Sequence, residues 1–238
     1  TNPCGVALGE SGLDAFRKAF QADPISAFGG IMATNQVIDV VVAQEMISNF
    51  WEVIIAPKFT EEALQIFETK PNVRLLEISQ KALSQSQSEE WRSIQGGWLV
   101  QENDHENTKS DLWEIKNENS LSDALKKDFG FGMKVVKHIK SNAICVVKDQ
   151  VTLGIGAGQM NRIGSAKIAL DQAGEKAKGA ILASDAFFPF GDTVELAAQF
   201  GITGIIQPGG SIRDEETIQV AKKHNINLVH TGVRHFRH

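Results

Sequence analysis

The sequence predicts an α/β fold, and three features of its 238 residues support that prediction. Short apolar segments typical of buried strands alternate with amphipathic segments along most of the chain. Hydrophobic residues make up 42% and charged residues 22% of the chain, as in an ordinary globular protein. A polar stretch at 84–123 interrupts the alternation. We therefore expect α/β subdomains at 1–83 and 124–238, joined by this connector.

The first half contains segments of both helical and strand character. Helices are expected to begin at the capping residues Ser11 and Thr60. A further helix is expected to bury Val42, Met46 and Phe50, which recur every four residues and so share one face. The expected strands are apolar runs, namely Gly30–Thr34, which should be buried, Glu52–Ala56 and Val73–Glu77.

The connector is polar at both ends and contains one expected strand, Gly96–Gln101. Its three tryptophans, Trp91, Trp98 and Trp113, predict that parts of it pack against the protein. After the connector, helical spacing resumes with Leu125, Phe129, Met133 and Val136. The strands expected in this half are Ala143–Val147, Gly179–Ala183, Gly204–Ile206 and Asn227–His230.

The two halves share a faint internal repeat. Asn2 and Cys4 are followed by an Asp-containing motif that ends in Ala-Phe at 27–28, and then by Ile-Ile-Ala-Pro57. In the second half the corresponding order is Asn142 and Cys145, Ser-Asp-Ala-Phe187 and Ile-Ile-Gln-Pro208. These motifs suggest a duplicated α/β subdomain, although by themselves they leave chance similarity open.

Charge and composition exclude several functional classes. A net charge of -5 gives no basic footprint for nucleic acid. No apolar run approaches the roughly 20 residues that span a bilayer, and no signal-peptide pattern is present at Thr1, so a cytoplasmic location is expected. The two cysteines, Cys4 and Cys145, are too few for a disulfide framework or a structural zinc site, and are expected to be buried thiols.

Several motifs group aromatic residues, glycines and charged residues more densely than a solvent-exposed loop would need. Gln207-Pro-Gly-Gly-Ser211 exposes bare backbone, which can approach a ligand closely. The motifs are Asn2–Gly5, Ala22–Gly30, Ile54–Pro57, Lys137–Asn142, Gly154–Arg162, Ser184–Phe190, Ile206–Asp214 and Arg234–His238. Across essentially the whole chain, in this order, they closely resemble the AICAR transformylases.

This resemblance implies formyl transfer from 10-formyltetrahydrofolate to the 5-amino group of AICAR. It also implies two tandem cytidine-deaminase-like subdomains and a homodimer with sites at the interface, and it allows a potassium ion near the C-terminal end. The zinc site of true deaminases is not expected, because Pro3-Cys4 is followed by Gly5-Val6-Ala7 rather than by a second cysteine. In the family a Lys-His pair, whose His is the general base, directly precedes the segment that begins at Thr1. We therefore expect the chain to be a fragment of a bifunctional protein whose other half is IMP cyclohydrolase.

The resemblance also assigns site residues. Asn142 is the expected catalytic residue, because its amide can both donate and accept hydrogen bonds while it orients the reacting groups. The AICAR contacts it implies are Gly29, Glu52, Asn142, Arg162, Phe187 and Arg234, and the folate contacts are Ile163, Phe187, Asp192, Ser211 and Ile212. Two positions depart from the family: Gly191 replaces a frequent Arg, and Glu52 is longer than the expected Asp.

Other interpretations of these residues stay open at this point. Asn142 could cap the following strand, and an arginine such as Arg162 could be a surface charge. Lys137-His138 has the same sequence as the Lys-His pair of the family, but His138 is expected to have a structural role or to help position Asn142. Gly154-Ile-Gly-Ala-Gly158 resembles part of the dinucleotide-binding fingerprint of a nucleotide-dependent dehydrogenase, although Gln159 stands in the place of its last glycine. A non-catalytic nucleotide- or folate-binding fragment, or a dimerisation fragment, is a further alternative.

Overall fold

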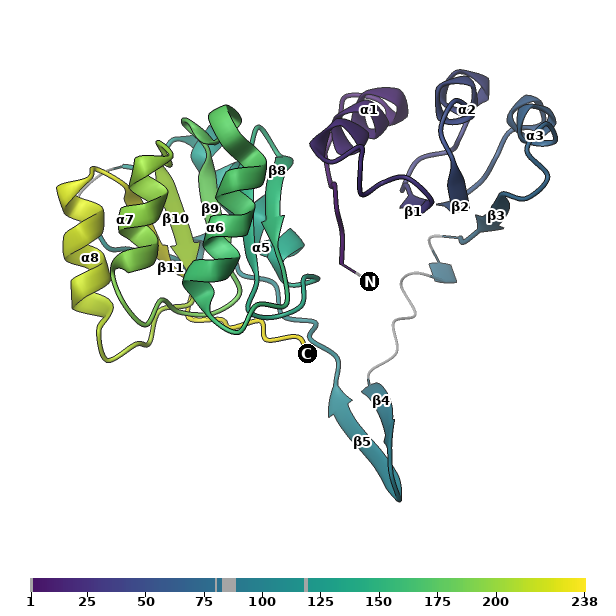
Figure 1. Cartoon of the computed structure of the whole chain (residues 1–238). Helices are drawn as coiled ribbons and strands as arrows, with labels where there is room; N and C mark the ends of the chain where they lie inside the picture. The colour runs from purple at the N-terminus through teal and green to yellow at the C-terminus, as the bar shows by residue number, and fades with distance from the viewer. Residues whose placement is uncertain (1, 80, 83–88, 118–119) are drawn as a thin grey trace. The chain divides into compact units, whose positions relative to one another are not determined.

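The computed structural model describes residues 2–79, 81–82, 89–117 and 120–238 (Figure 1). They form two compact units. The large unit comprises Thr1–Leu8, Lys18–Pro24 and Asn107–His238, and the small unit comprises Gly9–Arg17 and Ile25–Glu106. Residues 83–88 of the predicted connector lie outside the described residues. The mixed α/β fold class predicted from the sequence is confirmed.

The large unit is built on a six-stranded mixed sheet with the strand order β6-β11-β10-β9-β7-β8. Strands β9, β10 and β11 are parallel, whereas β7 is antiparallel to both β9 and β8, and β6 is antiparallel to β11. The strands are β6 (Glu114–Ile115), β7 (Ile144–Lys148), β8 (Val151–Gly156), β9 (Ile181–Ser184), β10 (Gly204–Gln207) and β11 (Asn227–His230). The four strands expected from the sequence in this half are thus confirmed to within two residues at each end.

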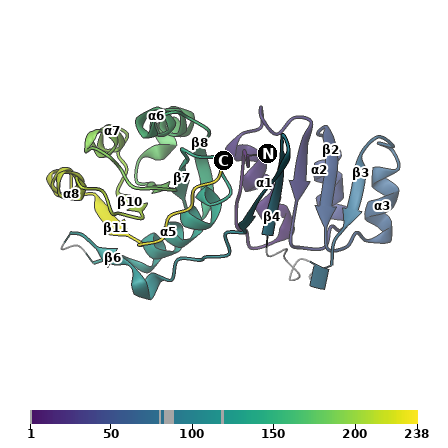
Figure 2. The same cartoon turned by 90° about the horizontal axis from the view of Figure 1, so that it is seen from below.

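Helices cover both faces of this sheet (Figure 2). Helices α6 (Arg162–Ala173), α7 (Asp192–Gln199) and α8 (Asp214–Lys223) lie on one face, and α5 (Asp123–Val136) lies on the other. Strand β7 shows why both faces are apolar, since successive side chains point to opposite sides of a strand. Ile144 and Val146 pack under α6–α8, whereas Cys145 and Val147 pack against α5. Short 3₁₀ turns occur at Ser110–Leu112 and Gly174–Ala177.

The glycines of the β8 segment allow α6 to lie directly on the strand. A Cβ atom built on Gly154 would lie 1.9 Å from the carbonyl oxygen of Ala169, and one on Gly156 would lie 1.9 Å from that of Ser165. Moreover, β8 is an antiparallel edge strand, whereas a dinucleotide-binding fingerprint follows a parallel strand of a βαβ unit. These glycines therefore serve helix–strand packing, and the dehydrogenase alternative loses its support.

The N-terminal segment forms an isolated bridge with the outer side of β8, the last strand of the large unit's sheet. The amide of Thr152 donates to Val6 O at 3.0 Å, the amide of Leu8 donates to Gln150 O at 3.0 Å, and Ala7 forms an antiparallel bridge with Val151. Residues 2–8 thus pack with the large unit, although the sequence groups them with the first subdomain. The subdomain boundaries at 83 and 123 stay predictions.

The small unit has a three-stranded parallel sheet in the order β1-β2-β3 and a separate antiparallel hairpin of β4 and β5. Its helices begin near the predicted capping residues, since Thr60 Oγ1 accepts from Ala63 N and Ser11 Oγ accepts from Asp14 N. The elements are α1 (Gly12–Ala22, whose last turns cluster with the large unit), β1 (Gly30–Ala33), α2 (Val40–Met46), β2 (Trp51–Ala56), α3 (Glu61–Phe67), β3 (Arg74–Glu77), β4 (Glu89–Ile94) and β5 (Gly97–Glu102).

Three details of the small unit differ from the sequence-based expectations. Strand β1 is present but not buried, because Ile31 is 67% exposed. Helix α2 ends before Phe50, which is 44% exposed and packs on Phe28 instead of on the helix. The expected single strand of the connector is one arm of a hairpin, on which the two tryptophans Trp91 and Trp98 contact each other and are largely exposed. Edge-to-face contact across the hairpin therefore replaces the packing predicted for these two side chains.

In the remainder of the predicted connector, Trp113 does pack, with its ring against Phe129 of α5 in the large unit. It lies beside β6, a short strand that the sequence did not reveal. With only two residues, β6 is too short to show the alternating pattern on which strand prediction depends.

The two units contain the same run of elements. The small unit has β1–α2–β2–α3–β3 with parallel strands, and the large unit has β9–α7–β10–α8–β11, also parallel. The Asp-containing motifs of the predicted repeat do not correspond, because Ala22–Phe28 precedes β1 whereas Ser184–Phe187 begins at the end of β9. By position, Ala33-Thr34 at the end of β1 is the counterpart of Ser184-Asp185.

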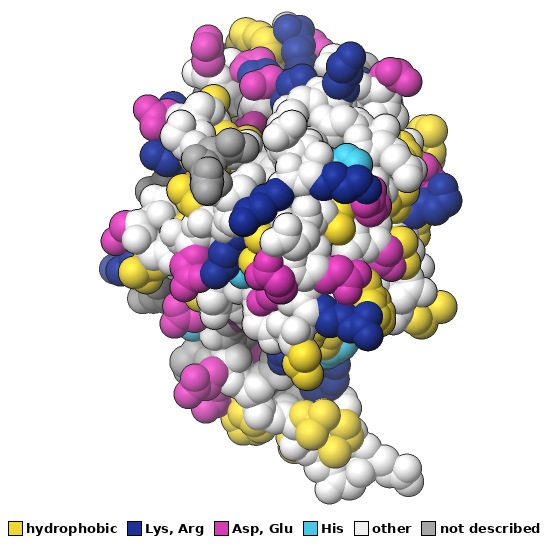
Figure 3. Space-filling model, turned by 90° about the vertical axis from the view of Figure 1, so that its left-hand side faces the viewer, with side chains coloured by type: hydrophobic (Ala, Val, Ile, Leu, Met, Phe, Trp, Pro, Cys, Tyr) yellow, Lys and Arg dark blue, Asp and Glu magenta, His cyan; other side chains and the backbone are white. Residues whose placement is uncertain are grey.

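On the side of the molecule where α8 lies, acidic and basic side chains are interspersed (Figure 3). Ion pairs account for part of this pattern: Glu195 contacts both Lys223 and His224, and Arg213 lies 3.8 Å from Glu216. In the described part of the chain, no helix combines the length and apolar character that crossing a bilayer requires.

Candidate functional site

The large unit gathers most of the predicted site residues at one edge of its sheet. The ends of β9, β10 and β11 meet the start of β7 there, since Ile144 pairs with Ser184 and Gln207 pairs with His230. Ligands of α/β sheets commonly bind outside the carboxyl ends of parallel strands. The predicted residues that adjoin this edge are Asn142, Arg162, Ile163, Phe187, Asp192, Ser211, Ile212 and Arg234.

A buried ion pair lies at the centre of this edge. Arg162 Nη1 is 2.5 Å from Asp185 Oδ1, and the two side chains are 5% and 1% exposed. The same Nη1 donates to Ser184 Oγ at 2.9 Å and Ala143 O at 3.3 Å. Asp185 also accepts from Ser141 Oγ and from the Ala143 amide. Both charges are thus compensated by several hydrogen bonds, as burial requires.

Asn142 is held on both sides of its amide. Its Oδ1 accepts from Arg162 Nη2 at 2.8 Å, and its Nδ2 donates to Gln159 O at 2.8 Å. The backbone oxygen of Asn142 accepts from Ser165 Oγ at 3.0 Å. Because the guanidinium can only donate and a carbonyl can only accept, the orientation of the amide is fixed. Asn142 is half-buried, and these contacts use one N–H and one lone pair of its side-chain amide.

The C-terminal segment is tied to the same cluster by backbone hydrogen bonds. The amide of Ser141 donates to Arg237 O at 2.8 Å, and the amide of His235 donates to Asp185 O at 2.9 Å. His235 is buried, whereas Arg234 is exposed, and its guanidinium lies 4.9 Å from the ring centre of Phe236. Arg234 is therefore placed beside the Asn142 cluster with a side chain that solvent can reach.

The predicted folate contacts surround the edge on exposed or half-buried positions. Phe187 is half-buried, Ile163 is 37% exposed and Ile212 is fully exposed. Asp192 begins α7, where its Oδ1 accepts from Thr193 N at 2.7 Å, and Ser211 Oγ accepts from Arg213 N at 3.1 Å. Three apolar side chains near polar loop groups form a surface suited to a flat, partly polar ligand.

Gly191, the departure from the family pattern, is accommodated by its neighbours. Its amide donates to Glu216 Oε1 at 3.0 Å, and a Cβ atom at this position would lie 2.9 Å from Val220 Cγ2. One residue earlier, the guanidinium of Arg213 lies 4.8 Å from the ring centre of Phe190. A side chain at position 191 would thus require the Val220 side chain on α8 to move.

The two AICAR contacts predicted in the first half lie in the small unit. Gly29 adopts a φ of +67°, which favours glycine, and its amide donates to Phe50 O at 3.0 Å. Glu52 is exposed, and its carboxylate pairs with Arg74 at 2.6 Å. Arg74 was not predicted to be near the site, and it leaves Glu52 fewer free lone pairs for a ligand.

Sequence reasoning missed four buried residues that shape the edge, namely Asp185, Ser165, Gln207 and His230. Asp185 and Gln207 lie within motifs quoted from the sequence, and each follows or ends a strand. Such a polar residue directly after an apolar strand was a usable signal. His230, which ends β11 as Gln207 ends β10, carried the same signal. Ser165 inside α6 gave none, because its partner Asn142 is distant in sequence.

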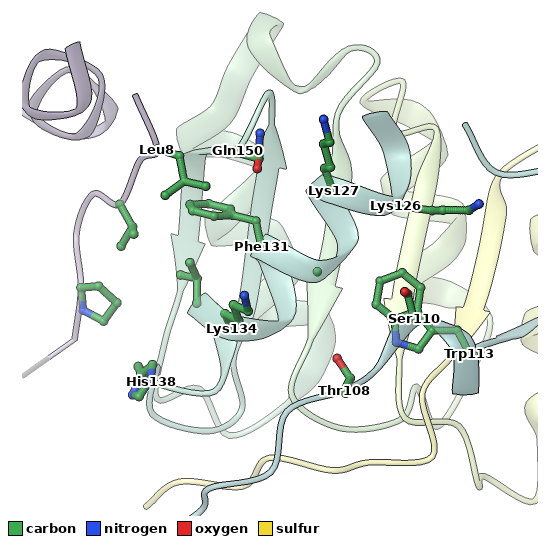
Figure 4. A pocket seen from close by; sticks show the side chains of 14 residues that line it. Leu8, Thr108, Ser110, Trp113, Lys126, Lys127, Phe131, Lys134, His138 and Gln150 are labelled. Carbon is green, nitrogen blue, oxygen red and sulfur yellow. The ribbon is translucent and has the colours of Figure 1, made fainter. Parts of the chain in front are cut away.

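A separate cavity of about 800 Å³ lies against α5 (Figure 4). Phe131, Val135 and Trp113 supply apolar walls, and Lys127 and Lys134 extend along the same helix. The complete lining comprises Pro3, Val6, Leu8, Thr108, Ser110, Trp113, Lys126, Lys127, Gly130, Phe131, Lys134, Val135, His138 and Gln150. This described lining includes His138 but none of the residues predicted to bind AICAR or folate.

The two cysteines, which the sequence predicts to be buried thiols, differ in burial. Cys145 is fully buried and Cys4 is half-buried, and burial raises the pKa of both thiols. For Cys4 the neighbouring charge of Asp23 adds to this effect. Within the described ranges, no three His, Cys, Asp or Glu side chains are grouped so as to hold a metal ion.

Comparison with known proteins places the chain in a family. A family model described as "AICARFT/IMPCHase bienzyme" matches residues 1–172. The "Bifunctional purine biosynthesis protein PurH" of Bacillus thuringiensis (strain Al Hakam) is 53% identical over 238 residues, which are 100% of this chain and 46% of that protein. The protein of the same name from Bacillus mycoides (strain KBAB4) is 52% identical with the same coverage.

Among solved structures, "Acinetobacter baumannii RibD, form 2" matches with a TM-score of 0.28 and 20% identity. The match covers 43% of this chain and 32% of that chain. This similarity is too weak to show a shared fold. The chain spans about half the length of the curated relatives it matches, since it covers 46% of each. With a family model that matches 172 of its residues, the chain belongs to the AICARFT/IMPCHase bienzyme family.

Proposed function

We propose that the edge of the large unit's sheet binds AICAR and 10-formyltetrahydrofolate and takes part in formyl transfer between them in purine biosynthesis. The single observation that carries this proposal is the convergence of Asn142, Arg162 and the Ser184–Asp192 segment at that edge in a chain that belongs to this family. The names of the bifunctional purine-biosynthesis relatives support the pathway.

In the proposed reaction the 5-amino nitrogen of AICAR attacks the formyl carbon. A C–N bond forms to AICAR, the bond between the formyl carbon and N10 of the folate breaks, the amine loses a proton and N10 gains one. The products are formyl-AICAR and tetrahydrofolate. The amine is a weak nucleophile because its lone pair is delocalised, so the site must hold both groups within attack distance and stabilise the developing oxyanion.

Asn142 is the residue best suited to orient the reacting groups. Its amide already has one donor and one acceptor engaged, to Gln159 O and from Arg162, and these contacts prevent it from rotating. The remaining N–H can donate to the carboxamide of AICAR or to the formyl oxygen as charge develops there. A pre-oriented donor needs no rearrangement during the reaction, which is the basis of its contribution to rate.

Arg162 is almost completely buried, and its main role is to hold the side chain of Asn142 in place. The residue is 6% exposed, and its two terminal nitrogens donate to four described protein groups. Its Nε and one remaining N–H are the groups through which it can hold AICAR. The exposed Arg234 is the better candidate for the outer, anionic part of the nucleotide, because its planar fork of donors is open.

The test uses the full-length natural protein with both substrates. We expect AICAR-dependent formation of tetrahydrofolate, followed by absorbance, and its reduction by Asn142→Ala. Gln219→Ala, which truncates an exposed amide on α8, is the matched control and should keep wild-type turnover. Folded wild-type protein that shows no AICAR-dependent turnover would exclude the proposed function.

A further inference from the structure

We infer that Gln207 and His230 are positioning residues that hold the loops 184–191 and 208–214 in one mutual arrangement. For the role of those loops in folate binding, the inference rests on the proposed function. The two residues end the neighbouring parallel strands β10 and β11, where they pair in register. Their side chains are 0% and 5% exposed, so solvent cannot substitute for the contacts between them.

The hydrogen bonds of Gln207 determine the protonation of His230. The amide of Phe188 donates to Gln207 Oε1 at 2.7 Å, which fixes the orientation of the Gln207 side chain. Gln207 Nε2 therefore points its N–H toward His230 Nε2, 3.1 Å away. Because that ring nitrogen must accept, the ring is neutral and carries its proton on Nδ1.

The other edge of the His230 ring faces the second loop. A Cβ atom on Gly209 would lie 2.4 Å from His230 Nδ1, so the ring packs directly on this glycine. Asp214 Oδ2 is 3.9 Å from the same nitrogen and accepts from the Gly210 amide at 2.7 Å. Asp214 Oδ1 accepts from the Ser211 amide at 3.2 Å. A continuous series of contacts thus joins the backbone of Phe188 to the backbone of Ser211.

Further contacts link the same two loops nearer to solvent. The guanidinium of Arg213 lies over Phe190, and Glu216 accepts from the Gly191 amide. Phe190 is 45% exposed and the hydrogen bond to Gly191 is partly buried, so both contacts lie nearer to solvent than the Gln207–His230 pair. These two contacts surround the buried Gln207–His230 pair. Phe187 and Ser211, the predicted folate contacts, lie on the two loops that the pair connects.

The charged groups around His230 come from three elements. Asp214 at the start of α8 and Glu114 on β6 favour the protonated ring, whereas burial and Lys116 after β6 oppose it. Burial is the largest of these influences and lowers the pKa of His230. In a protonated ring, Nε2 would carry a hydrogen that faces the N–H of Gln207, and the hydrogen bond between the two side chains would be lost. Lowering the pH should therefore separate the two loops.

The first experiment reads the ring directly by nitrogen NMR of the full chain. We expect His230 to be the neutral Nδ1–H form at neutral pH. In the isosteric variant Gln207→Glu a carboxylate replaces the donor, so the ring should gain a proton on Nε2 and titrate at higher pH. A wild-type ring that is already protonated on Nε2, or a variant with the wild-type titration, would overturn the geometry.

The second experiment measures turnover of the full-length natural protein. Gln207→Glu and His230→Gln should each raise the KM for 10-formyltetrahydrofolate by about tenfold, with a smaller change for AICAR. His224→Gln, the same change at a half-buried histidine of the same unit, is the control. Wild-type KM values in both variants would refute the positioning role. Absence of turnover in the wild-type protein would instead refute the proposed function, and the NMR titration would then decide the geometry by itself.

Discussion

Arg162 binds Asp185 and Asn142 at the same time, with Nη1 2.5 Å from the carboxylate and Nη2 2.8 Å from the amide oxygen. One guanidinium therefore neutralises a buried acid and orients the residue predicted to act on substrate. This arrangement explains why an arginine that the sequence suggests as a ligand clamp is 6% exposed. It also makes stability and activity inseparable at this position.

Replacing Arg162 by Ala should destabilise the chain strongly. The change leaves Asp185 charged and buried with its ionic partner removed, which typically costs about 3–5 kcal/mol. Lys167→Ala is the control on the same helix, because the exposed Lys167–Asp171 pair should contribute at most about 1 kcal/mol. Urea unfolding followed by circular dichroism measures both free energies. Similar losses in the two variants would show that the Arg162–Asp185 pair contributes little.

Changing Asn142 should lower activity while the fold is preserved. In the full-length natural protein, Asn142→Ala removes one positioned donor, and kcat should fall roughly 100-fold. Asn142→Asp should keep the contact with Arg162 but lose the donor to Gln159 O, and it should be similarly impaired. Kinetics with saturating folate cosubstrate and unfolding curves separate the two effects. Unchanged kcat in both variants would remove Asn142 from the site.

The stability of the chain should decrease below about pH 6.5 through His230. Since burial lowers the pKa of this ring, the unfolded chain binds its proton at a higher pH than the folded chain does. The contribution is complete above the unfolded pKa and is lost as the pH falls toward the folded value. Urea unfolding at about pH 7 and about pH 5.5 should show a smaller pH dependence for His230→Gln than for His224→Gln. Equal pH dependence would mean that another group titrates.

Two adjacent glycines allow a matched test of the His230 contact. Gly209 and Gly210 have φ values of +74° and +95°, so alanine at either position meets backbone strain of about 1–2 kcal/mol. In addition, a Cβ on Gly209 would collide with the His230 ring, whereas one on Gly210 has no described atom within 4 Å. Gly209→Ala should therefore destabilise the protein more than Gly210→Ala and shift the NMR signals of His230. The reverse order would contradict the placement of the ring.

The sequence predicts the elements whose stability comes from local patterns. Strand β2 and helix α5 have the apolar period of their type, and α3 has its capping residue Thr60, so all three are found close to their predicted bounds. The two-residue strand β6 and the exposed face of β1 could not be predicted, because they depend on pairing with distant residues. Phe50 was wrongly assigned to α2, because the apolar residues keep helical spacing beyond the residue at which the helix ends.

The sequence names candidate residues for this edge of the sheet, but not the contacts that connect them. Motif positions indicate Asn142 and Arg162, yet nothing local indicates that Asp185, 23 residues beyond Arg162, would bind the guanidinium. Gln207 and His230 are likewise brought together by strand order rather than by spacing. Buried polar partners become visible when the topology is known, because each must satisfy the other away from water.

Formyl transfer to AICAR at this edge of the sheet, as proposed above, can be tested directly. The most direct measurement incubates the full-length natural protein with AICAR and 10-formyltetrahydrofolate carrying an isotopic label in the formyl group, and identifies the product by mass spectrometry. We expect labelled formyl-AICAR with wild-type protein and with Gln219→Ala, and a roughly 100-fold lower rate with Asn142→Ala. Label that never reaches AICAR, or that reaches it equally fast with Asn142→Ala, would contradict the proposal.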